Sequence, residues 1–345
     1  MNQLIINGLF LSQRPTGVHR FAYEMCVALQ NEHCDFIVVA PRRILRNHYA
    51  ITFPLQQIGI NSGHLWEQVD LPLFMSVHYR HTTLVSFTGL GPLFRKKHIT
   101  TIHDVSFLVN HHWFSTAYYL FYKWATPIVA KHASHIITVS QFSKKEIASY
   151  LSVKTNKITV IYNAIANHFC VPASNNMSLP ARPYMLAVSS HDPRKNFKRL
   201  IDAYLLSDIT THDLIIVGGS ARTFANERWT EHPHIHLVGY VSDNELRDFY
   251  RHATLFIYPS LYEGFGIPPL EALAQGCPVL ASNIEVLHEI YDNAITYCNP
   301  TNPNDIANKM RQCITHPLFN TTQVKRCLEQ YSWKKSAQIF IQSFV

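Results

Sequence analysis

Short apolar runs recur along the whole chain, and amphipathic or polar segments of helical length separate them. A continuous apolar run of this length is typical of a strand that is buried on both faces of a parallel sheet. The runs predict strands at residues 4–6, 36–39, 84–87, 99–102, 135–139, 158–161, 184–188, 214–219, 235–240 and 255–258. Strands and helices therefore alternate, as they do in a doubly wound α/β sheet.

The helical segments are predicted from apolar spacing and from capping residues. Residues 14–30 carry apolar side chains at the spacing of one helix face, and residues 303–316 and 332–344 are also predicted helices. Two serine–glutamate capping boxes predict helix starts: Ser143 with Glu146 before residues 144–151, and Ser242 with Glu245 before the helix that ends at residue 252.

A polar, proline-bearing stretch without periodicity interrupts this alternation near the middle of the chain. We predict an N-terminal Rossmann-like domain at residues 1–168, a linker at 169–182, a second Rossmann-like domain at 183–328 and a terminal helix at 329–345. A chain of 345 residues exceeds the size at which one hydrophobic core usually stops growing, so two domains are expected.

The composition indicates a well-buried globular protein, because 47% of the residues are hydrophobic and only 15% are charged. The seven cysteines are scattered without a Cys-x-x-Cys pair, so neither a zinc site nor a disulfide framework is predicted, and a reducing cytoplasm is favoured. No signal peptide is apparent, and no window approaches the roughly 20 apolar residues that span a bilayer. We expect a soluble or peripheral protein.

Positive charge is concentrated in the first half of the chain. Residues 1–168 hold 15 Lys and Arg against 7 Asp and Glu, whereas residues 169–345 hold 15 against 16. Such an excess of positive charge in one half suggests an anionic membrane surface or nucleic acid as partner, or simply drift in surface composition. The aromatic-rich stretch 107–132 favours either a membrane interface or an ordinary core helix. The basic patch Arg42, Arg43 and Arg46 is interpreted as solvated surface, with lipid contact as the alternative.

The densest candidate chemistry lies in residues 261–283, LYEGFGIPPLEALAQGCPVLASN. They predict a loop, a helix that ends at Gly276, and a further strand. The glycine loop lets backbone approach a ligand closely, and a loop that feeds a helix N-terminus favours phosphate. Glu263 and Glu271 flank that loop, where their carboxylates are suited to accept hydrogen bonds from sugar and ribose hydroxyls.

This string resembles the Glu-x7-Glu donor signature of the retaining GT-B glycosyltransferases of family 4, also called glycosyl transferases group 1. The branch that it resembles contains bacterial O-antigen and capsule mannosyl- and rhamnosyltransferases. The resemblance implies a GT-B fold, in which two doubly wound parallel-sheet domains are followed by a C-terminal helix that crosses back to the first domain. It also implies the donor contacts: Arg194 and Lys195 on the diphosphate, Glu271 on the ribose, and Glu263, Gly264, Phe265, Gly266 and Ile267 on the transferred sugar.

Two loops of the first half resemble the family in part. Gly17 lies in a strand–glycine–helix segment that matches the first donor-facing loop of the family, although His19 replaces its second glycine. His103 and Asp104 follow a predicted strand, at the edge where open α/β sheets bind ligands. The resemblance implies that His103 lies near the reacting sugar on the acceptor side. Asp104 is expected to orient it or to cap the loop.

Further matches and departures concern the rest of the chain. Gly218 and Tyr240 follow predicted strands and are expected at the nucleotide side of the donor site. Ser190 stands where many relatives carry an arginine, so Arg194 is expected to substitute, and Ala164 stands where the family usually has glycine. Residues 65–73, LWEQVDLPL, resemble a segment common in the polysaccharide branch and are interpreted as a packed helix.

With these features, the resemblance implies a retaining glycosyltransferase that moves a hexose, mannose or rhamnose, from a nucleotide-sugar to a lipid-linked (undecaprenyl-diphosphate) saccharide. It would act peripherally at the inner face of the cytoplasmic membrane, with His103, Arg194, Lys195 and Glu263 as catalytic residues. Neither a metal nor another cofactor is expected, because there is no Asp-x-Asp motif and the Arg–Lys pair supplies positive charge. Nucleic-acid binding would leave residues 261–283 unexplained. A GT-B nucleotide-sugar epimerase or hydrolase, and a catalytically silent nucleotide-sugar-binding protein, stay open as alternatives.

Overall fold

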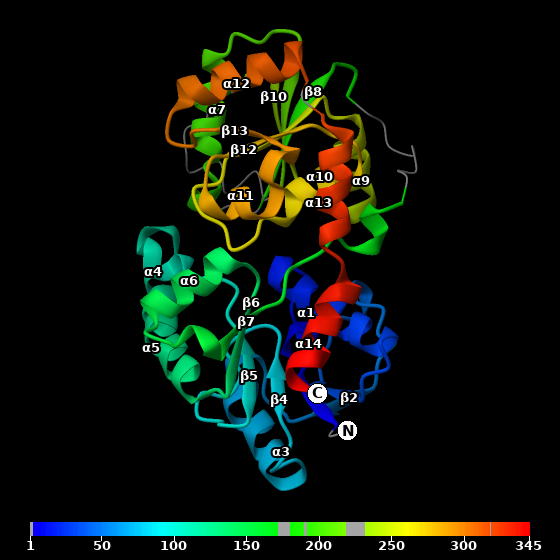
Figure 1. The fold of residues 1–345 in the computed structure, drawn as a ribbon, viewed down its shortest axis with the longest axis vertical. Helices are drawn as coiled ribbons and strands as arrows, with labels where there is room; N and C mark the ends of the chain where they lie inside the picture. Colours follow the sequence, from blue (N-terminus) through cyan, green and yellow to red (C-terminus); the bar gives the residue numbers. More distant parts are fainter. Residues whose placement is uncertain (1–2, 172–179, 190–191, 219–231, 318) are drawn as a thin grey trace. The chain divides into compact units, whose positions relative to one another are not determined.

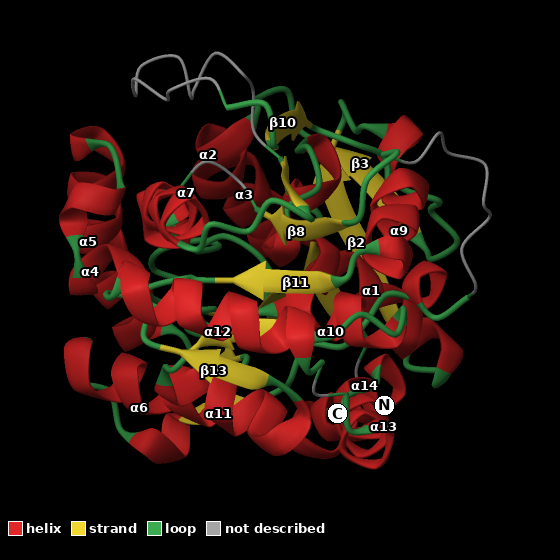
Figure 2. Ribbon diagram, turned by 90° about the horizontal axis from the view of Figure 1, so that it is seen from above, coloured by secondary structure: helices red, strands yellow, loops and turns green. Residues whose placement is uncertain are grey.

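The computed structural model describes residues 3–171, 180–189, 192–218, 232–317 and 319–345. The chain forms two compact units, one of Met1–Asn163 with Tyr331–Val345 and the other of Ala164–Gln330. Each unit contains one parallel sheet enclosed by helices (Figures 1 and 2). The prediction of two doubly wound parallel sheets is therefore confirmed. The chain passes between the units at residues 163 and 330, where the sequence suggested domain boundaries at 168 and 328.

The first unit has a sheet of seven parallel strands among its described residues, in the order β3-β2-β1-β4-β5-β6-β7. From β1 the chain first builds β2 and β3 on one side and then returns to build β4 on the other, so the topological switch point lies between β1 and β4. The strands are β1 (Leu4–Asn7), β2 (Phe36–Pro41), β3 (Leu55–Ile58), β4 (Leu84–Ser86), β5 (His98–Thr101), β6 (His135–Thr138) and β7 (Ile158–Val160).

The helices of the first unit include the last helix of the chain, α14 (Trp333–Phe344), which packs beside α1 (Gly17–Asn31) (Figure 1). The rings of Phe21 and Trp333 meet edge to face at 5.8 Å, and Ser336 Oγ donates a hydrogen bond to the carbonyl of Tyr162 at 2.7 Å. The other helical segments are η1 (Leu9–Ser12), η2 (Arg46–His48), α2 (Gly63–Leu65), the π-helix η3 (Trp66–Asp70), α3 (Leu71–His78), α4 (Ser106–Val109), η4 (His111–Trp113), α5 (Thr116–His132), α6 (Gln141–Tyr150) and η5 (Thr155–Lys157).

The second unit repeats this plan with six described strands in the order β10-β9-β8-β11-β12-β13, so its switch point lies between β8 and β11. The strands are β8 (Tyr184–Val188), β9 (Asp213–Val217), β10 (Ile235–Gly239), β11 (Leu255–Tyr258), β12 (Val279–Ser282) and β13 (Thr296–Cys298). The helices are η6 (Asn167–Phe169), η7 (Pro193–Lys195), α7 (Phe197–Leu206), α9 (Asp243–His252), α10 (Ile267–Ala274), α11 (Glu285–Tyr291), η8 (Asp292–Ala294), α12 (Pro303–Thr315) and α13 (Thr321–Gln330).

Every strand predicted from an apolar run is present, and the capping box of Ser242 and Glu245 is confirmed at the start of α9. The capping box predicted at Ser143 is wrong. Ser140 has the extended backbone of an N-cap, and its hydroxyl accepts the Ser143 N–H at 2.9 Å, so α6 begins three residues earlier than expected. The stretch 107–132 is also not one helix, because Asn110 and Ser115 cap new helical segments within it.

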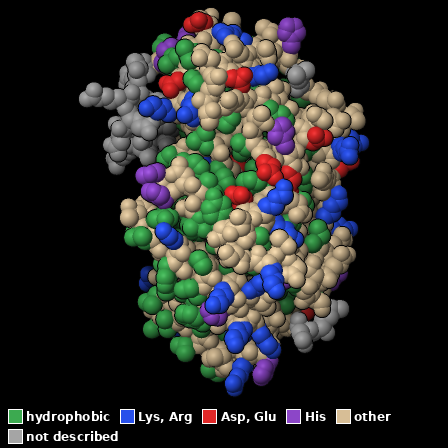
Figure 3. Space-filling view, turned by 60° about the vertical axis from the view of Figure 1, so that its left-hand side comes forward, with side chains coloured by type: hydrophobic (Ala, Val, Ile, Leu, Met, Phe, Trp, Pro, Cys, Tyr) green, Lys and Arg blue, Asp and Glu red, His purple; other side chains and the backbone are tan. Residues whose placement is uncertain are grey.

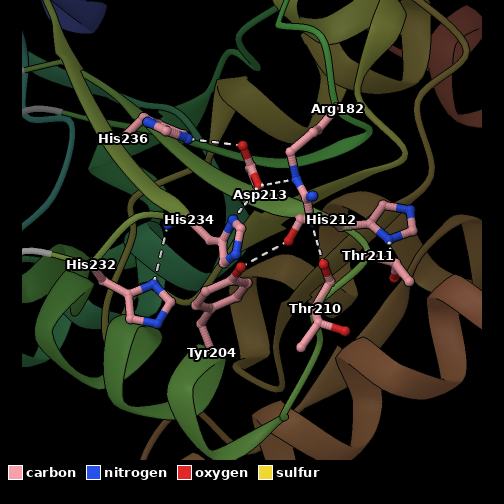
Figure 4. Close-up of polar contacts among 9 residues, drawn as sticks. All are labelled: Arg182, Tyr204, Thr210, Thr211, His212, Asp213, His232, His234 and His236. Atoms are coloured by element: carbon pink, nitrogen blue, oxygen red, sulfur yellow. Dashed lines mark hydrogen bonds and ion pairs between the residues drawn. The ribbon is translucent and has the colours of Figure 1, made fainter.

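His234 and His236 form hydrogen bonds at the amino-terminal ends of three neighbouring strands of the second unit (Figure 4). Asp213, the first residue of β9, is 5% exposed. Its carboxylate accepts hydrogen bonds from Arg182 Nε at 2.9 Å, His234 Nδ1 at 3.0 Å and His236 Nε2 at 2.9 Å. Arg182 precedes β8 and the two histidines belong to the β10 region, so one buried carboxylate joins three strands. This edge lies opposite the carboxyl ends, where ligands bind, which indicates a structural role.

Replacing Asp213 with Ala is expected to lower the free energy of unfolding by about 2 kcal/mol at pH 7, because three donors lose an acceptor that is itself buried. Burial raises the pKa of Asp213, but His236, Arg182 and His234 together bring it below the usual 3.8. The carboxylate therefore stabilises the fold above that pH, and the difference from wild type should narrow as the pH falls further. Urea unfolding measures both effects. Asp202→Ala, on the exposed face of α7, is the control, and an equal loss there would contradict the prediction.

Candidate active site

The predicted donor residues Lys195 and Glu263 meet at the switch point of the second unit. Lys195 ends η7, just after β8, and Glu263 follows β11, the neighbouring strand. Lys195 Nζ lies 2.5 Å from Glu263 Oε1 and 3.2 Å from the hydroxyl of Tyr258, which itself donates to Glu263 Oε1 at 2.6 Å. Residues 68 positions apart thus form one buried cluster at the edge of the sheet where ligands bind.

The charges of this cluster are fixed by their neighbours. Burial alone would raise the pKa of Glu263, but Lys195 and Arg194 outweigh it and lower that pKa, so the carboxylate stays ionised. Burial and the Glu263 charge raise the pKa of Tyr258 well above its usual value, so its hydroxyl stays protonated. An ammonium group has three N–H bonds, and Glu263 and Tyr258 occupy two of those of Lys195. The third suits a ligand anion.

Arg194 lies beside this cluster and is held by its own loop. Asp192 Oδ1 accepts the backbone N–H of Arg194 at 3.0 Å, and Asp192 Oδ2 accepts its Nε at 2.9 Å. Asn196 has the left-handed backbone conformation, with φ of 63°, and its amide donates to the carbonyls of Pro259 and Pro300. The loop after β8 is thereby tied to the loops after β11 and β13. Ser190, also predicted to matter here, lies outside the described residues.

The glycine loop continues from Glu263 into α10. Gly266 has φ of 88°, and a Cβ there would lie 2.9 Å from Leu287 Cδ2, so only glycine fits. Its carbonyl accepts a hydrogen bond from the Tyr291 hydroxyl, and Phe265 beside it is buried. Of the first three helical residues only Ile267 carries an N–H, because two prolines follow it. The dipole of α10 therefore still favours an anion, but its first turn has fewer free N–H donors than a phosphate site was predicted to offer.

Glu271 lies one turn further along α10 and is 6% exposed. Tyr250 of α9 donates its hydroxyl to Glu271 Oε2 at 3.1 Å. Burial and the nearby Glu271 charge raise the pKa of Tyr250 well above its usual value, so this donor keeps its proton. The carboxylate is therefore held in one orientation before any ligand arrives, which reduces the entropy that ligand binding must offset.

Gly218 and Tyr240 lie at the same carboxyl edge, after β9 and β10. Gly218 has φ of 108°, and a Cβ there would overlap the carbonyl oxygen of Ser189 at 2.0 Å. Its N–H donates to the carbonyl of Gly239 at 2.7 Å, so the ends of three strands are drawn together. Tyr240 is 81% exposed, which is unusual for an aromatic ring and suits a platform for a nucleotide base.

The other predicted residues belong to the first unit. His103 follows β5, and its Nε2 lies 3.1 Å from the carbonyl of Phe87, which follows β4. A carbonyl only accepts hydrogen bonds, so Nε2 carries the proton and Nδ1 is an acceptor. Burial lowers the pKa of His103 to about 4, which keeps the ring neutral at pH 7. Asp104 caps the following turn, since its Oδ1 accepts the Ser106 N–H at 2.9 Å.

Gly17 is the first residue of α1, and a Cβ there would meet no protein atom within 4 Å. Packing therefore does not require glycine at this position, and the close approach of a ligand stays the predicted reason for it. His19, which replaces the second glycine of the family loop, folds back, and its Nδ1 lies 2.9 Å from Thr16 Oγ1.

Sequence reasoning missed a buried carboxylate in the LWEQVDLPL segment. Glu67 is fully buried on the π-helix η3, a helix type that often marks functional sites. Its Oε1 accepts hydrogen bonds from Asn7 Nδ2 at 2.8 Å and from the Gly91 N–H at 3.1 Å. Asn7 ends β1 and also donates to Ser86, the last residue of β4, at 3.1 Å. Glu67 therefore fixes the switch point of the first unit, and its i,i+3 neighbour His64 has its pKa raised by it.

Two parallel-sheet units of this kind are the architecture of a GT-B glycosyltransferase. Comparisons with known proteins establish the family. Residues 157–329 match the family "Glycosyl transferases group 1", and residues 15–167 match "Glycosyltransferase Family 4". The chain belongs to the group 1 glycosyltransferases of family 4, and the resemblance stated from the sequence is confirmed.

Two curated relatives and one solved structure illustrate the likeness. O-antigen chain mannosyltransferase B of Escherichia coli is 29% identical over 71% of this chain and 70% of its own length. O-antigen chain mannosyltransferase RfbU of Salmonella typhimurium is 31% identical over 61% of this chain and 58% of its own length. HepE of Anabaena, solved with UDP and glucose, superposes with a TM-score of 0.74 over 99% of both chains at 16% identity, which shows the fold.

Proposed function

We propose that this chain is a retaining mannosyltransferase of O-antigen synthesis that takes its sugar from a nucleotide-sugar, with rhamnose as the alternative sugar. The observation that carries this proposal is the buried Lys195–Glu263 pair at the β8–β11 switch point, beside the bare backbone of Gly266. A cation, a hydroxyl acceptor and accessible backbone are what a sugar diphosphate requires. The names of the two mannosyltransferase relatives support mannose, and the UDP and glucose in HepE support a nucleotide-sugar donor.

In the proposed reaction, the bond between the anomeric carbon and the diphosphate oxygen breaks, and the acceptor oxygen bonds to that carbon on the same face. The acceptor proton passes to the leaving phosphate oxygen, so neither glutamate forms a covalent intermediate. The third N–H of Lys195, with the Arg194 guanidinium, stabilises the charge that develops on the diphosphate. Glu263 keeps Lys195 in place and accepts a sugar hydroxyl, and Glu271 accepts the ribose hydroxyls.

His103 has a separate role in this proposal. The Nε2–H of His103 donates a hydrogen bond to the carbonyl of Phe87, and the neutral ring presents Nδ1 as a hydrogen-bond acceptor. It therefore positions a hydroxyl of the transferred sugar, and Asp104 fixes the backbone that carries it. No metal is required in this scheme, because Lys195 and Arg194 supply the positive charge. Rates in the presence of EDTA should equal rates without it, and restoration by added Mg²⁺ would contradict this part.

The direct test is transfer from GDP-mannose, dTDP-rhamnose and UDP-glucose to a lipid-linked saccharide, with the new linkage assigned by NMR. We expect one donor to be used and its anomeric configuration to be kept in the product. Release of free sugar at the same rate with and without acceptor would instead identify a hydrolase. Donor binding without any turnover would identify the silent binding protein.

We also propose that the first unit contacts an anionic membrane surface at the cytoplasmic face, where a lipid-linked acceptor is found. The helix α5 exposes Tyr118, Leu120 and Trp124, and Phe94 packs beside its end while 68% exposed. Lys123 lies among these side chains, over the Tyr119 ring. Figure 3 shows hydrophobic side chains gathered over this side of the first unit, with Lys and Arg side chains nearby. Such rings and lysines suit the headgroup region.

No helix among the described residues is long and apolar enough to cross a membrane. Flotation with liposomes tests peripheral contact: the wild type should float with anionic liposomes and less with neutral ones. The variant Leu120→Ser/Trp124→Ser should float at least severalfold less. Leu205→Ser/Leu206→Ser removes two exposed leucines of the second unit and is the matched control. Equal flotation of both variants would remove α5 from the proposal.

A further inference from the structure

A cavity of about 610 Å³ lies in the first unit, at the carboxyl ends of β1, β2 and β3. This is the sheet edge where α/β proteins bind ligands, and the volume is within the usual range for ligand sites. None of the residues that line it has a role in the proposed donor chemistry. Its lining residues come from the end of η1, from the end of β2 and the loop after it, and from the loop after β3: Ser12, Gln13, Pro41, Arg42, Arg43, Ile60, Asn61, Ser62 and Gly63.

Two of the segments that line this cavity, those at Gln13 and at Arg42, are held by hydrogen bonds. Tyr49 donates its hydroxyl to the carbonyl of Gln13 at 3.2 Å. Gln57 of β3 donates its amide to the carbonyl of Arg42 at 2.7 Å. The backbone that carries these lining side chains is therefore fixed before a ligand binds, which favours binding because less entropy is lost.

The third lining segment, residues 60–63, is held by Asp70, which is not itself a lining residue. Its Oδ2 accepts the N–H groups of Ile60 at 2.9 Å and Asn61 at 2.8 Å, and its Oδ1 accepts the Asn61 side-chain amide at 2.8 Å. Burial alone would raise the pKa of Asp70, but these hydrogen bonds from Asn61 and Ile60 lower it. This carboxylate therefore holds the loop at Ile60 and Asn61 in place without lining the cavity itself.

The charge inside the cavity is positive. The exposed side chains of Arg42 and Arg43 line it, and no lining residue is acidic. Among the described residues, neither arginine forms an ion pair. A guanidinium group binds phosphate oxygens through two parallel N–H bonds, and two adjacent groups suit a diphosphate. The hydroxyl and amide side chains of Ser12, Asn61 and Ser62 can bond to the hydroxyls of an attached sugar.

We propose that this cavity binds the diphosphate of the saccharide acceptor, with Arg42 and Arg43 as its ligands. The inference rests on the proposed function, since it assigns the acceptor of that reaction. Arg42 and Arg43 are exposed, in agreement with the interpretation of the basic patch as solvated surface. They also line this cavity, whereas Arg46 of η2 does not.

The kinetic test uses Arg42→Gln/Arg43→Gln, with Arg46→Gln as a control that removes charge from the same loop. Two acceptors are compared: a saccharide on a short-chain prenyl diphosphate, and the same saccharide as an alkyl glycoside without phosphate. The double variant should raise KM for the diphosphate acceptor by about 10- to 100-fold, with kcat, the donor KM and the KM for the alkyl glycoside unchanged. An equal rise for both acceptors, or none, overturns the proposal.

A binding measurement separates failure of this inference from failure of the proposed function. Inorganic pyrophosphate is titrated by calorimetry into protein saturated with the nucleoside diphosphate that fills the donor site. We expect binding that the Arg42→Gln/Arg43→Gln variant loses and Arg46→Gln keeps, whether or not transfer is observed. Absence of pyrophosphate binding in the wild type contradicts the cavity assignment. Loss of flotation with anionic liposomes in the double variant, with an unchanged acceptor KM, would instead assign the arginines to lipid headgroups.

Discussion

Replacing Lys195 with Ala is expected to lower kcat/KM for sugar transfer about 1,000-fold, because the leaving diphosphate loses its buried cation. The same change should lower the free energy of unfolding by about 3–5 kcal/mol, since Glu263 then stays buried without its partner. Steady-state kinetics and urea unfolding measure the two effects. Lys198→Ala, at an exposed lysine in the first turn of α7, is the control and should change neither.

A second variant separates loss of charge from loss of fold. Lys195→Met combined with Glu263→Leu replaces the buried pair with apolar side chains, and such replacements are often neutral for stability. The double variant should regain most of the stability lost by Lys195→Ala while its transfer rate stays at the low level. Recovery of the rate together with stability would mean that the pair only supports the fold.

Acidification is expected to destabilise the protein steeply between pH 6.5 and pH 4, through His98 and His103. Burial lowers the pKa of His98 to about 3 and that of His103 to about 4, both from 6.5. The unfolded chain therefore binds protons in this range that the folded chain does not. Stability is complete above pH 6.5 and is lost as the pH falls towards the folded values. Together the two rings should remove about 6 kcal/mol by pH 4.

Tryptophan fluorescence during urea unfolding follows this effect, because four of the five tryptophans lie in the first unit with both histidines. The variant His98→Gln removes one titrating ring, so the slope of stability against pH should fall by about half, whatever the stability at neutral pH. His81→Gln changes an exposed ring and should leave the slope as it is. A wild-type slope near zero in this range would contradict the assignment.

The apolar runs predicted most strands because a strand buried on both faces has a pattern that local sequence displays. The two strands missed, β3 and β13, lack that pattern. β3 is the edge strand Leu55–Ile58, with two exposed glutamines at its centre, and β13 is three residues long. The first residues of α6 were missed for a different reason. A serine three residues before a polar residue is common, and only the extended backbone of Ser140 shows which serine is the cap.

The candidate site was predictable where its residues are neighbours in the chain, as in residues 261–283. What the sequence did not show is which distant side chains fix those residues. Tyr258 lies three residues before this segment, yet its hydrogen bond to Glu263 depends on the turn between them. Tyr250 reaches Glu271 from another helix. Glu67 lies 60 residues from Asn7, its main partner, and no local pattern records such a contact.

The central claim is that the second unit holds a nucleotide-sugar donor site, and thermal stabilisation by UDP, GDP, dTDP and ADP tests it most directly. A ligand at about 100 times its dissociation constant adds about 2.7 kcal/mol to stability, which a melting curve resolves easily. We predict that one of the four raises Tm of the wild type. We predict further that Glu271→Ala abolishes this shift, while Glu285→Ala, on the exposed face of α11, keeps it. Folded wild-type protein that none of the four nucleotides stabilises would contradict the account.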